Sequence, residues 1–126
     1  MEDHLLAIAG SGFALILLAD LIGNNITFTN RIYNALVTSL VWGGLFFALN
    51  FLYERLNPPP LLLWEHFWKW AVIGVILAFL ADLIGNSLAF RSRYRNAIVT
   101  ACVWVVAFYV LAVYLTWYWT GKLVVI

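Results

Sequence analysis

Long apolar stretches alternate with short polar ones along the chain. The charged residues fall in clusters, and residues 32–53 and 96–121 contain none. Each stretch is longer than the roughly 20 residues that a helix needs to cross a bilayer, where only helices or closed barrels satisfy their own backbone hydrogen bonds. The pattern predicts an all-α integral membrane protein with four transmembrane helices. We place these helices near residues 4–23, 34–55, 63–85 and 96–120.

Composition supports a membrane protein. Hydrophobic residues make up 65% of the 126 positions and charged residues only 10%, whereas soluble domains carry about a quarter charged residues. The net charge of +1 offers no basic face for nucleic acid, so we expect the lipid bilayer as the main partner. The single cysteine, Cys102, cannot form an internal disulfide. The sequence predicts no cofactor.

The second half of the chain repeats the first with an offset of 62 positions. Residues 4–53 match residues 66–115 without a gap at 21 of 50 positions, against about one in ten expected by chance for so biased a composition. Each copy contains two spans, so the copies run parallel, as two tandem two-helix units related by an axis along the membrane normal. We expect a first unit at 1–56, a proline-rich link at 57–62 and a second unit at 63–126.

Helix ends are predicted from local capping chemistry. Gly23 and Gly85, each followed by an asparagine, are typical of a helix C-terminus. Asn34 and Asn96 are plausible N-caps of the following helices. The three prolines at 58–60 cannot continue a helix, so the second helix must end before them.

Orientation follows from the basic residues. The rule that basic loops stay in the cytoplasm predicts that the loops inside the units are cytoplasmic and that both termini lie outside the cytoplasm. The count is four to three: Arg31, Arg91, Arg93 and Arg95 in those loops against Arg55, Lys69 and Lys122 toward the other side.

Two acidic residues lie inside apolar segments, Asp20 and its copy Asp82. An acid within a membrane segment is a candidate proton or cation site. The alternative is structural, and we favour it, because both acids are predicted at interfacial depth. Asp20 then caps backbone amides of the next helix or pairs with Arg31 across its own hairpin, and Asp82 pairs with Arg93 in the same way.

A stripe of side chains recurs every four residues and therefore lies on one helix face. Such a stripe lines a pocket for a quinone, pigment or aromatic drug, or it forms a seam where helices pack, which we favour. The stripe consists of Asn34, Thr38, Trp42 and Phe46, with the copy Asn96, Thr100, Trp104 and Phe108. Gly43 and Gly44 beside the first stripe correspond to Val105 and Val106 beside the second, so the two halves should have different neighbours.

Two histidines, His4 and His66, begin the first and third predicted helices at equal depth. Together they are candidate axial ligands of a haem iron or, with nearby acids, ligands of a divalent metal. The alternative, which we favour, is a pair of histidines in the headgroup region.

The pattern resembles the bacterial transmembrane pair domain of the proteobacterial antimicrobial compound efflux family, whose members are also two tandem two-helix units. His4 opens the first helix, and Asn50, Tyr53, Glu54 and Arg55 close the second with that family's Asn-x-x-aromatic-acid-base pattern. Ala9 stands where the family carries a glutamate. The resemblance implies small-molecule efflux coupled to protons.

Because the sequence contains no recognisable catalytic or nucleotide-binding motif, we expect that the protein is not an enzyme. The first functional hypothesis is an accessory or structural subunit of a larger membrane assembly. The second is a small-molecule exporter that works as an oligomer, and the third is haem or metal binding through His4 and His66. We expect a homo-oligomer or contacts with other membrane subunits.

Overall fold

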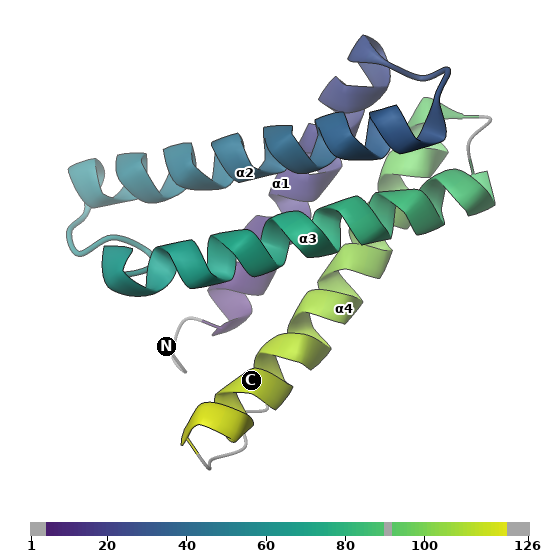
Figure 1. Cartoon of the computed structure of the whole chain (residues 1–126). Coiled ribbons are helices and arrows are strands. Elements are labelled where there is room, and N and C mark those ends of the chain that lie inside the picture. The colour runs from purple at the N-terminus through teal and green to yellow at the C-terminus, as the bar shows by residue number, and fades with distance from the viewer. Residues whose placement is uncertain (1–4, 90–91, 121–126) are drawn as a thin grey trace.

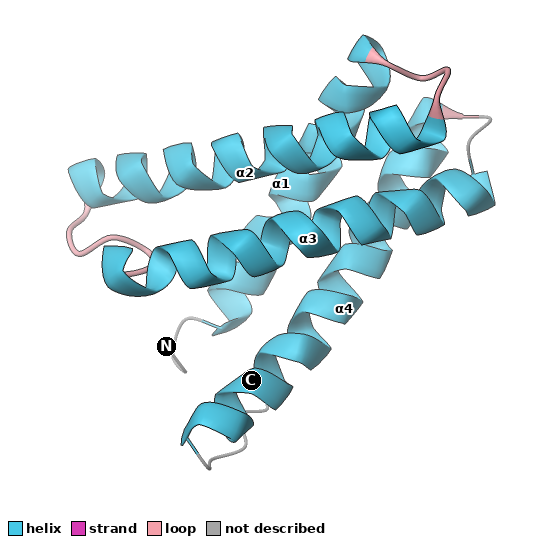
Figure 2. Cartoon of the chain, viewed as in Figure 1, coloured by secondary structure: helices cyan, strands magenta, loops and turns pink. Residues whose placement is uncertain are grey.

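The computed structural model describes residues 5–89 and 92–120 (Figure 1). The described chain forms four helices: α1 (Leu5–Ile26), α2 (Arg31–Leu56), α3 (Trp64–Ala89) and α4 (Arg93–Thr120). Figure 2 shows only helices and short connections in this part of the chain. The predicted all-α class is confirmed.

All four helices are long and apolar enough to cross a membrane. Their best windows have a mean hydropathy between 1.4 for α1 and 2.4 for α4. Large apolar side chains such as Leu40, Ile76 and Val110 remain exposed on the outside of the bundle. An apolar exterior of this kind is what lipid contact requires, so the fold is consistent with a multi-pass membrane protein.

The helices form two hairpins, hairpin 1 (α1 and α2) and hairpin 2 (α3 and α4). In Figure 1, α2 and α3 run side by side, and α1 and α4 cross behind them at an angle. Each helix packs against two neighbours in the ring α1, α2, α3, α4, while α1 also touches α3 across the diagonal. The ends of α1 and α3 and the starts of α2 and α4 gather at one end of the bundle, called the loop end below.

The second helix ends at Leu56, before the prolines, as predicted, but the helix ends at the loop end differ from those predicted. Asn30, four residues before Asn34, caps α2 because its side chain accepts hydrogen bonds from the amides of Ile32 and Tyr33, both at 3.0 Å. Ser92 accepts from the amide of Arg95 at 3.3 Å near the start of α4. The predicted N-cap roles of Asn34 and Asn96 are therefore wrong, since both lie inside their helices. An asparagine or serine one turn earlier provides the same capping chemistry.

The predicted C-caps at Gly23 and Gly85 are wrong as well, since α1 and α3 continue past them. A Cβ at Gly23 would overlap the hydroxyl of Thr38, and a Cβ at Gly85 would overlap that of Thr100. These glycines therefore allow a close approach between the two helices of each hairpin.

The link between the hairpins is fastened by side chains of α2. Asn50 donates to the carbonyl of Leu62 at 2.9 Å and accepts from its amide at 2.8 Å. The Glu54 carboxylate accepts from the Trp64 indole at 3.2 Å. The asparagine and the acid of the Asn-x-x-aromatic-acid-base pattern thus hold the start of α3 against the end of α2.

Candidate functional site

A buried polar core lies between the hairpins, in the half of the bundle nearer the loop end. All of its side chains are at most 1% exposed. It has two layers, an asparagine ring (Asn24, Asn34, Asn86 and Asn96) and an acid layer (Asp20, Asp82, Thr38 and Thr100). In each layer, every residue of hairpin 2 stands 62 positions after an identical residue of hairpin 1.

The asparagine ring is a closed cycle of side-chain hydrogen bonds. Each amide nitrogen donates to the carbonyl oxygen of the next member: Asn24 to Asn96 at 3.2 Å, Asn96 to Asn86 at 2.6 Å, Asn86 to Asn34 at 3.1 Å and Asn34 to Asn24 at 2.8 Å. Two of these bonds join hairpin 1 to hairpin 2. The ring therefore fastens all four helices to one another close to the loop end.

Ring members also bond the backbone where helices begin and end. Asn24 donates to the carbonyl of Arg93 at 3.0 Å, and Asn86 donates to the carbonyl of Arg31 at 2.9 Å. Each of these bonds reaches from one hairpin to the first residue of the other hairpin's second helix. Buried amides need such partners, so the ring sets the relative position of the hairpins.

The acid layer lies one helical turn farther from the loop end than the asparagine ring. Thr38 donates its hydroxyl to one carboxyl oxygen of Asp20 at 3.0 Å, and Thr100 donates to Asp82 at 2.9 Å. Contact between α1 and α3 brings the two carboxyl groups, called the acid pair below, next to each other, and each is close to both threonines. The acid pair is thus one site made by both hairpins.

Each member of the acid pair has one oxygen without a partner. Both Oδ2 atoms are buried, and no donor from the described residues hydrogen-bonds either of them. Arg93, the residue predicted to pair with Asp82, instead donates to Asn25 at 3.2 Å and lies over the Phe28 ring at 5.5 Å. The structure therefore places Arg93 against hairpin 1 and away from the acid of its own hairpin.

The two acids lie farther from the helix ends than the sequence predicts. Because α1 continues to Ile26, Asp20 is six residues from the helix end, or about 9 Å along the axis. Its partner Thr38 lies two turns inside α2 rather than one. The capping role predicted for Asp20 therefore gives way to a hydrogen bond with Thr38 inside the bundle.

Two tryptophans close the core on the side away from the loop end. Trp42 donates its indole N–H to the carbonyl of Gly12 at 3.3 Å, and Trp104 donates to Gly74 at 3.2 Å. The two ring centroids are 5.3 Å apart. Gly12 also lies against the Trp104 ring, and Gly74 against the Trp42 ring, where a Cβ would overlap the indole. Each tryptophan therefore bonds its own hairpin and packs on the other.

The predicted stripes meet at this seam. Phe46 stacks on Trp42 with centroids 4.9 Å apart, and Phe108 stacks on Trp104 at 4.7 Å. All four rings are at most 2% exposed. The stripe residues are close-packed along the seam, which favours the packing interpretation over a ligand pocket.

The structure adds little to the predicted haem or metal site. His4 lies outside the described residues. His66 is half-exposed, and its Nε2 atom lies 3.6 Å from the Glu65 carboxylate on the same helix. Within residues 5–89 and 92–120, no three histidine, cysteine or acidic side chains group as metal ligands would.

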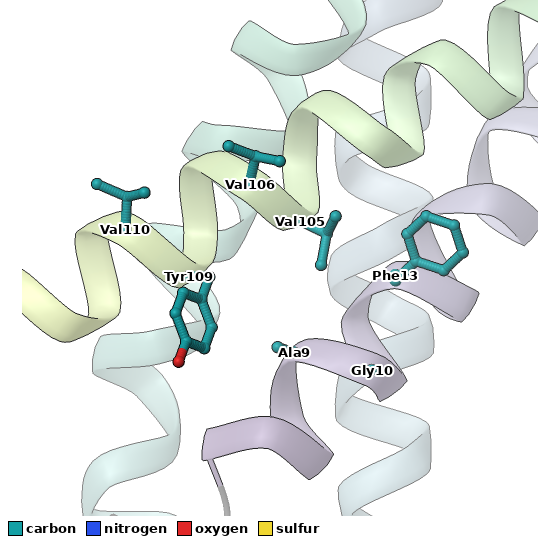
Figure 3. Close-up of a pocket in the computed structure, with 7 residues that line it drawn as sticks. All are labelled: Ala9, Gly10, Phe13, Val105, Val106, Tyr109 and Val110. Atoms are coloured by element: carbon teal, nitrogen blue, oxygen red, sulfur yellow. The ribbon is translucent and has the colours of Figure 1, made fainter. Parts of the chain in front are cut away.

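An open apolar groove of about 420 Å³ runs between α1 and α4 (Figure 3). It is lined by Ala9, Gly10, Phe13, Val105, Val106, Tyr109 and Val110. At the corresponding place between α2 and α3, a Cβ on Gly43 would meet Val75 at 2.9 Å, so those helices are in close contact. The two halves therefore differ in their neighbours, as predicted, although only Gly43 is in close contact and Gly44 faces open space.

Comparison with protein-family models, with curated proteins and with solved structures finds no match for this chain. The resemblance to the efflux family therefore stays a prediction. The polar core is therefore the feature of this chain that bears on its function.

Proposed function

We propose that the chain is a multi-pass membrane protein of two parallel tandem hairpin repeats that exports small molecules, with the acid pair as its coupling site. The observation that carries this proposal is the pair of buried carboxyl groups, each with an oxygen that lacks a hydrogen-bond donor. The proposal reverses the order of the two leading sequence-based hypotheses. An accessory role becomes the second candidate.

A purely structural role does not account for the acid pair. The asparagine ring and the tryptophan seam already fasten the hairpins with satisfied hydrogen bonds. Two buried acids side by side add repulsion and a desolvation cost of several kcal/mol for each charge when they are ionised. Acids retained inside a membrane at such cost are functional sites by default, because ions and protons bind there.

The position of the acid pair suits a transporter of repeated hairpins. One carboxyl group comes from α1 and the other from α3, so the site lies between the two repeats. In transporters built from repeats, substrates and coupling ions bind at such interfaces, and one repeat rocks against the other around the site. A shift between the hairpins would separate the two carboxyl groups and release whatever they hold.

Uptake into proteoliposomes tests this proposal. Ethidium, a fluorescent aromatic cation of the kind that the efflux resemblance suggests, serves as the probe under an imposed sodium or proton gradient. We expect uptake by the native chain and at least a tenfold loss in Asp20→Asn and Asp82→Asn. Glu65→Gln, which neutralises a carboxylate that is 72% exposed, should transport normally. Absence of gradient-driven uptake, or uptake that is unchanged in both aspartate variants, would overturn the proposal.

An accessory subunit is the second candidate because of the apolar groove between α1 and α4. Cys102 lies exposed on α4 one turn before Val106, which is a groove residue. Disulfide crosslinking through Cys102 in native membranes reports what α4 faces there. A crosslinked homodimer would support the predicted oligomer. A crosslink to a different subunit, together with no transport by the purified chain, would favour the accessory role.

We also propose that the loop end faces the cytoplasm, with both termini outside, on the strength of four arginines that the sequence places in or directly after the loops of the two hairpins. Cysteines introduced at Thr29 and Ser92 in a Cys102→Ala background should resist an impermeant thiol reagent added to intact cells. A cysteine at Pro59 should react. The reverse labelling pattern would invert the orientation.

A further inference from the structure

We propose that the acid pair binds one small, hard metal cation, with the hydroxyl groups of Thr38 and Thr100 completing its ligands. This inference rests on the proposed export function, for which it identifies the class of coupling ion.

The ligand chemistry comes from oxygen alone. The two carboxyl groups and two hydroxyl groups supply at most six oxygen atoms, one side chain from each of the four helices. Oxygen ligands suit Na⁺, Mg²⁺ and Ca²⁺, whereas Zn²⁺ and Cu²⁺ favour imidazole or thiolate. No histidine or cysteine of the described residues joins the two acids.

The hydrogen-bond pattern leaves atoms available for a cation. Each threonine donates its only hydroxyl hydrogen to the first oxygen of its aspartate, so the hydroxyl lone pairs remain free to coordinate. Both second carboxyl oxygens are buried without a donor. When both acids are ionised, their two charges require a positive partner, because an uncompensated buried charge is strongly unfavourable. A cation at the centre of the layer would use all of these groups at once.

The surrounding contacts favour a small ion. Gly23 lets Thr38 approach α1, and Gly85 lets Thr100 approach α3, so both hydroxyl groups are drawn toward the acids. The asparagine ring and the tryptophans close the layer on its two sides. An ion in this position must lose most of its water, which Mg²⁺ does reluctantly. Na⁺ is therefore the first probe, with Ca²⁺ and Mg²⁺ as further ones.

The test is a melting experiment on the full chain in detergent, at fixed pH and ionic strength, with choline chloride replaced stepwise by NaCl. We expect a saturable rise of about 5 °C in the melting temperature, because a ligand that binds only the folded state stabilises it. Parallel titrations use CaCl₂ and MgCl₂ in the same choline background. A saturable response to any of the three metals supports the proposal when it depends on the ligand residues.

Variants make that dependence measurable. The rise should vanish in the Asp20→Asn/Asp82→Asn double variant and fall by more than half in Thr38→Val or Thr100→Val. Thr29→Val makes the same change at an exposed position and should respond like the native chain. If the double variant does not fold, the two threonine variants alone decide the outcome.

Two results would overturn the inference: identical melting in all salts, or a metal response that survives in the variants. Failure here is separable from failure of the export function. Ethidium uptake that needs the acid pair, without a melting response to any metal, would leave export standing and assign coupling to protons. A metal response without uptake of ethidium would leave the cation site standing and remove the evidence for export.

Discussion

Hairpin 1 and hairpin 2 are alike at the centre of the interface between them, in the polar core and the tryptophan seam, and different around that centre. The acids, ring asparagines, threonines, tryptophans and close-contact glycines of the interface are identical in both. Outside this centre, Asn50 in α2 corresponds to Ala112 in α4, and Gly43 corresponds to Val105. Identity between the hairpins therefore marks the centre of the interface between them.

The residues that differ reflect the different contacts that each hairpin makes outside this centre. Asn50 holds the link that follows α2, whereas Ala112 at the corresponding position of α4 packs in the core. Gly43 permits contact between α2 and α3, whereas Val105 lines the groove between α1 and α4. The two hairpins thus share the centre of their interface and differ around it.

The largest effect should come from breaking the asparagine ring. Asn34→Ala leaves the carbonyl oxygen of Asn24 and an amide hydrogen of Asn86 unsatisfied, at a cost of about 3 kcal/mol, because buried unpaired polar groups lose solvation without compensation. Asn96→Ala, its counterpart in hairpin 2, should cost the same within about 0.5 kcal/mol. Denaturant or thermal unfolding in detergent measures both.

The double variant Asn34→Ala/Asn96→Ala sharpens this prediction. Residues in one hydrogen-bond network are coupled, so the double cost should fall clearly below the sum of the two single costs. Unequal single costs, or a double cost that equals their sum, would mean that the ring does not act as one symmetric unit.

Overpacking the tryptophan seam should have the next largest effect. Gly12→Ala places a methyl group against the Trp104 ring, and Gly74→Ala places one against Trp42. Each should destabilise the fold by about 2 kcal/mol, because buried rings held by a hydrogen bond cannot shift freely. Gly10→Ala is the matched control, since nothing lies within 4 Å of its added Cβ. Equal melting of Gly12→Ala and Gly10→Ala would contradict the close approach.

The smallest effect concerns the periphery. Asn50→Ala removes two hydrogen bonds to Leu62 and should cost about 1–2 kcal/mol, as typical hydrogen bonds contribute about 1 kcal/mol each. Transport should be unchanged, because the acid pair is untouched. Ethidium uptake at a temperature well below the melting point checks this, and lost uptake in a folded variant would show that the link also takes part in transport.

The four helices and part of the polar core could be predicted from the sequence. Apolar length predicts the spans, and the 62-residue repeat singles out Asp20, Thr38, Trp42 and their copies. The helix ends at the loop end could not be predicted, because a Gly-Asn pair has the chemistry of a cap and local patterns do not report what a side chain meets on another helix.

The asparagine ring was missed for the same reason. Asn24 and Asn86 belong to the longest identical run of the repeat, residues 18–24 and 80–86, and that identity was the available signal. Their cap-like context concealed it. The pairing of the two acids depends on contact between α1 and α3, which no local pattern contains.

The melting temperatures of Asp20→Asn and Asp82→Asn in choline buffer without metal salts test most directly whether the acid pair is a functional site. Asparagine keeps an oxygen for the threonine hydroxyl and removes a buried charge and its repulsion, so each variant should melt at or above the native temperature although it fails to transport. A fall of several degrees in either variant would show that the carboxyl groups themselves hold the hairpins together, which contradicts their assignment as a coupling site.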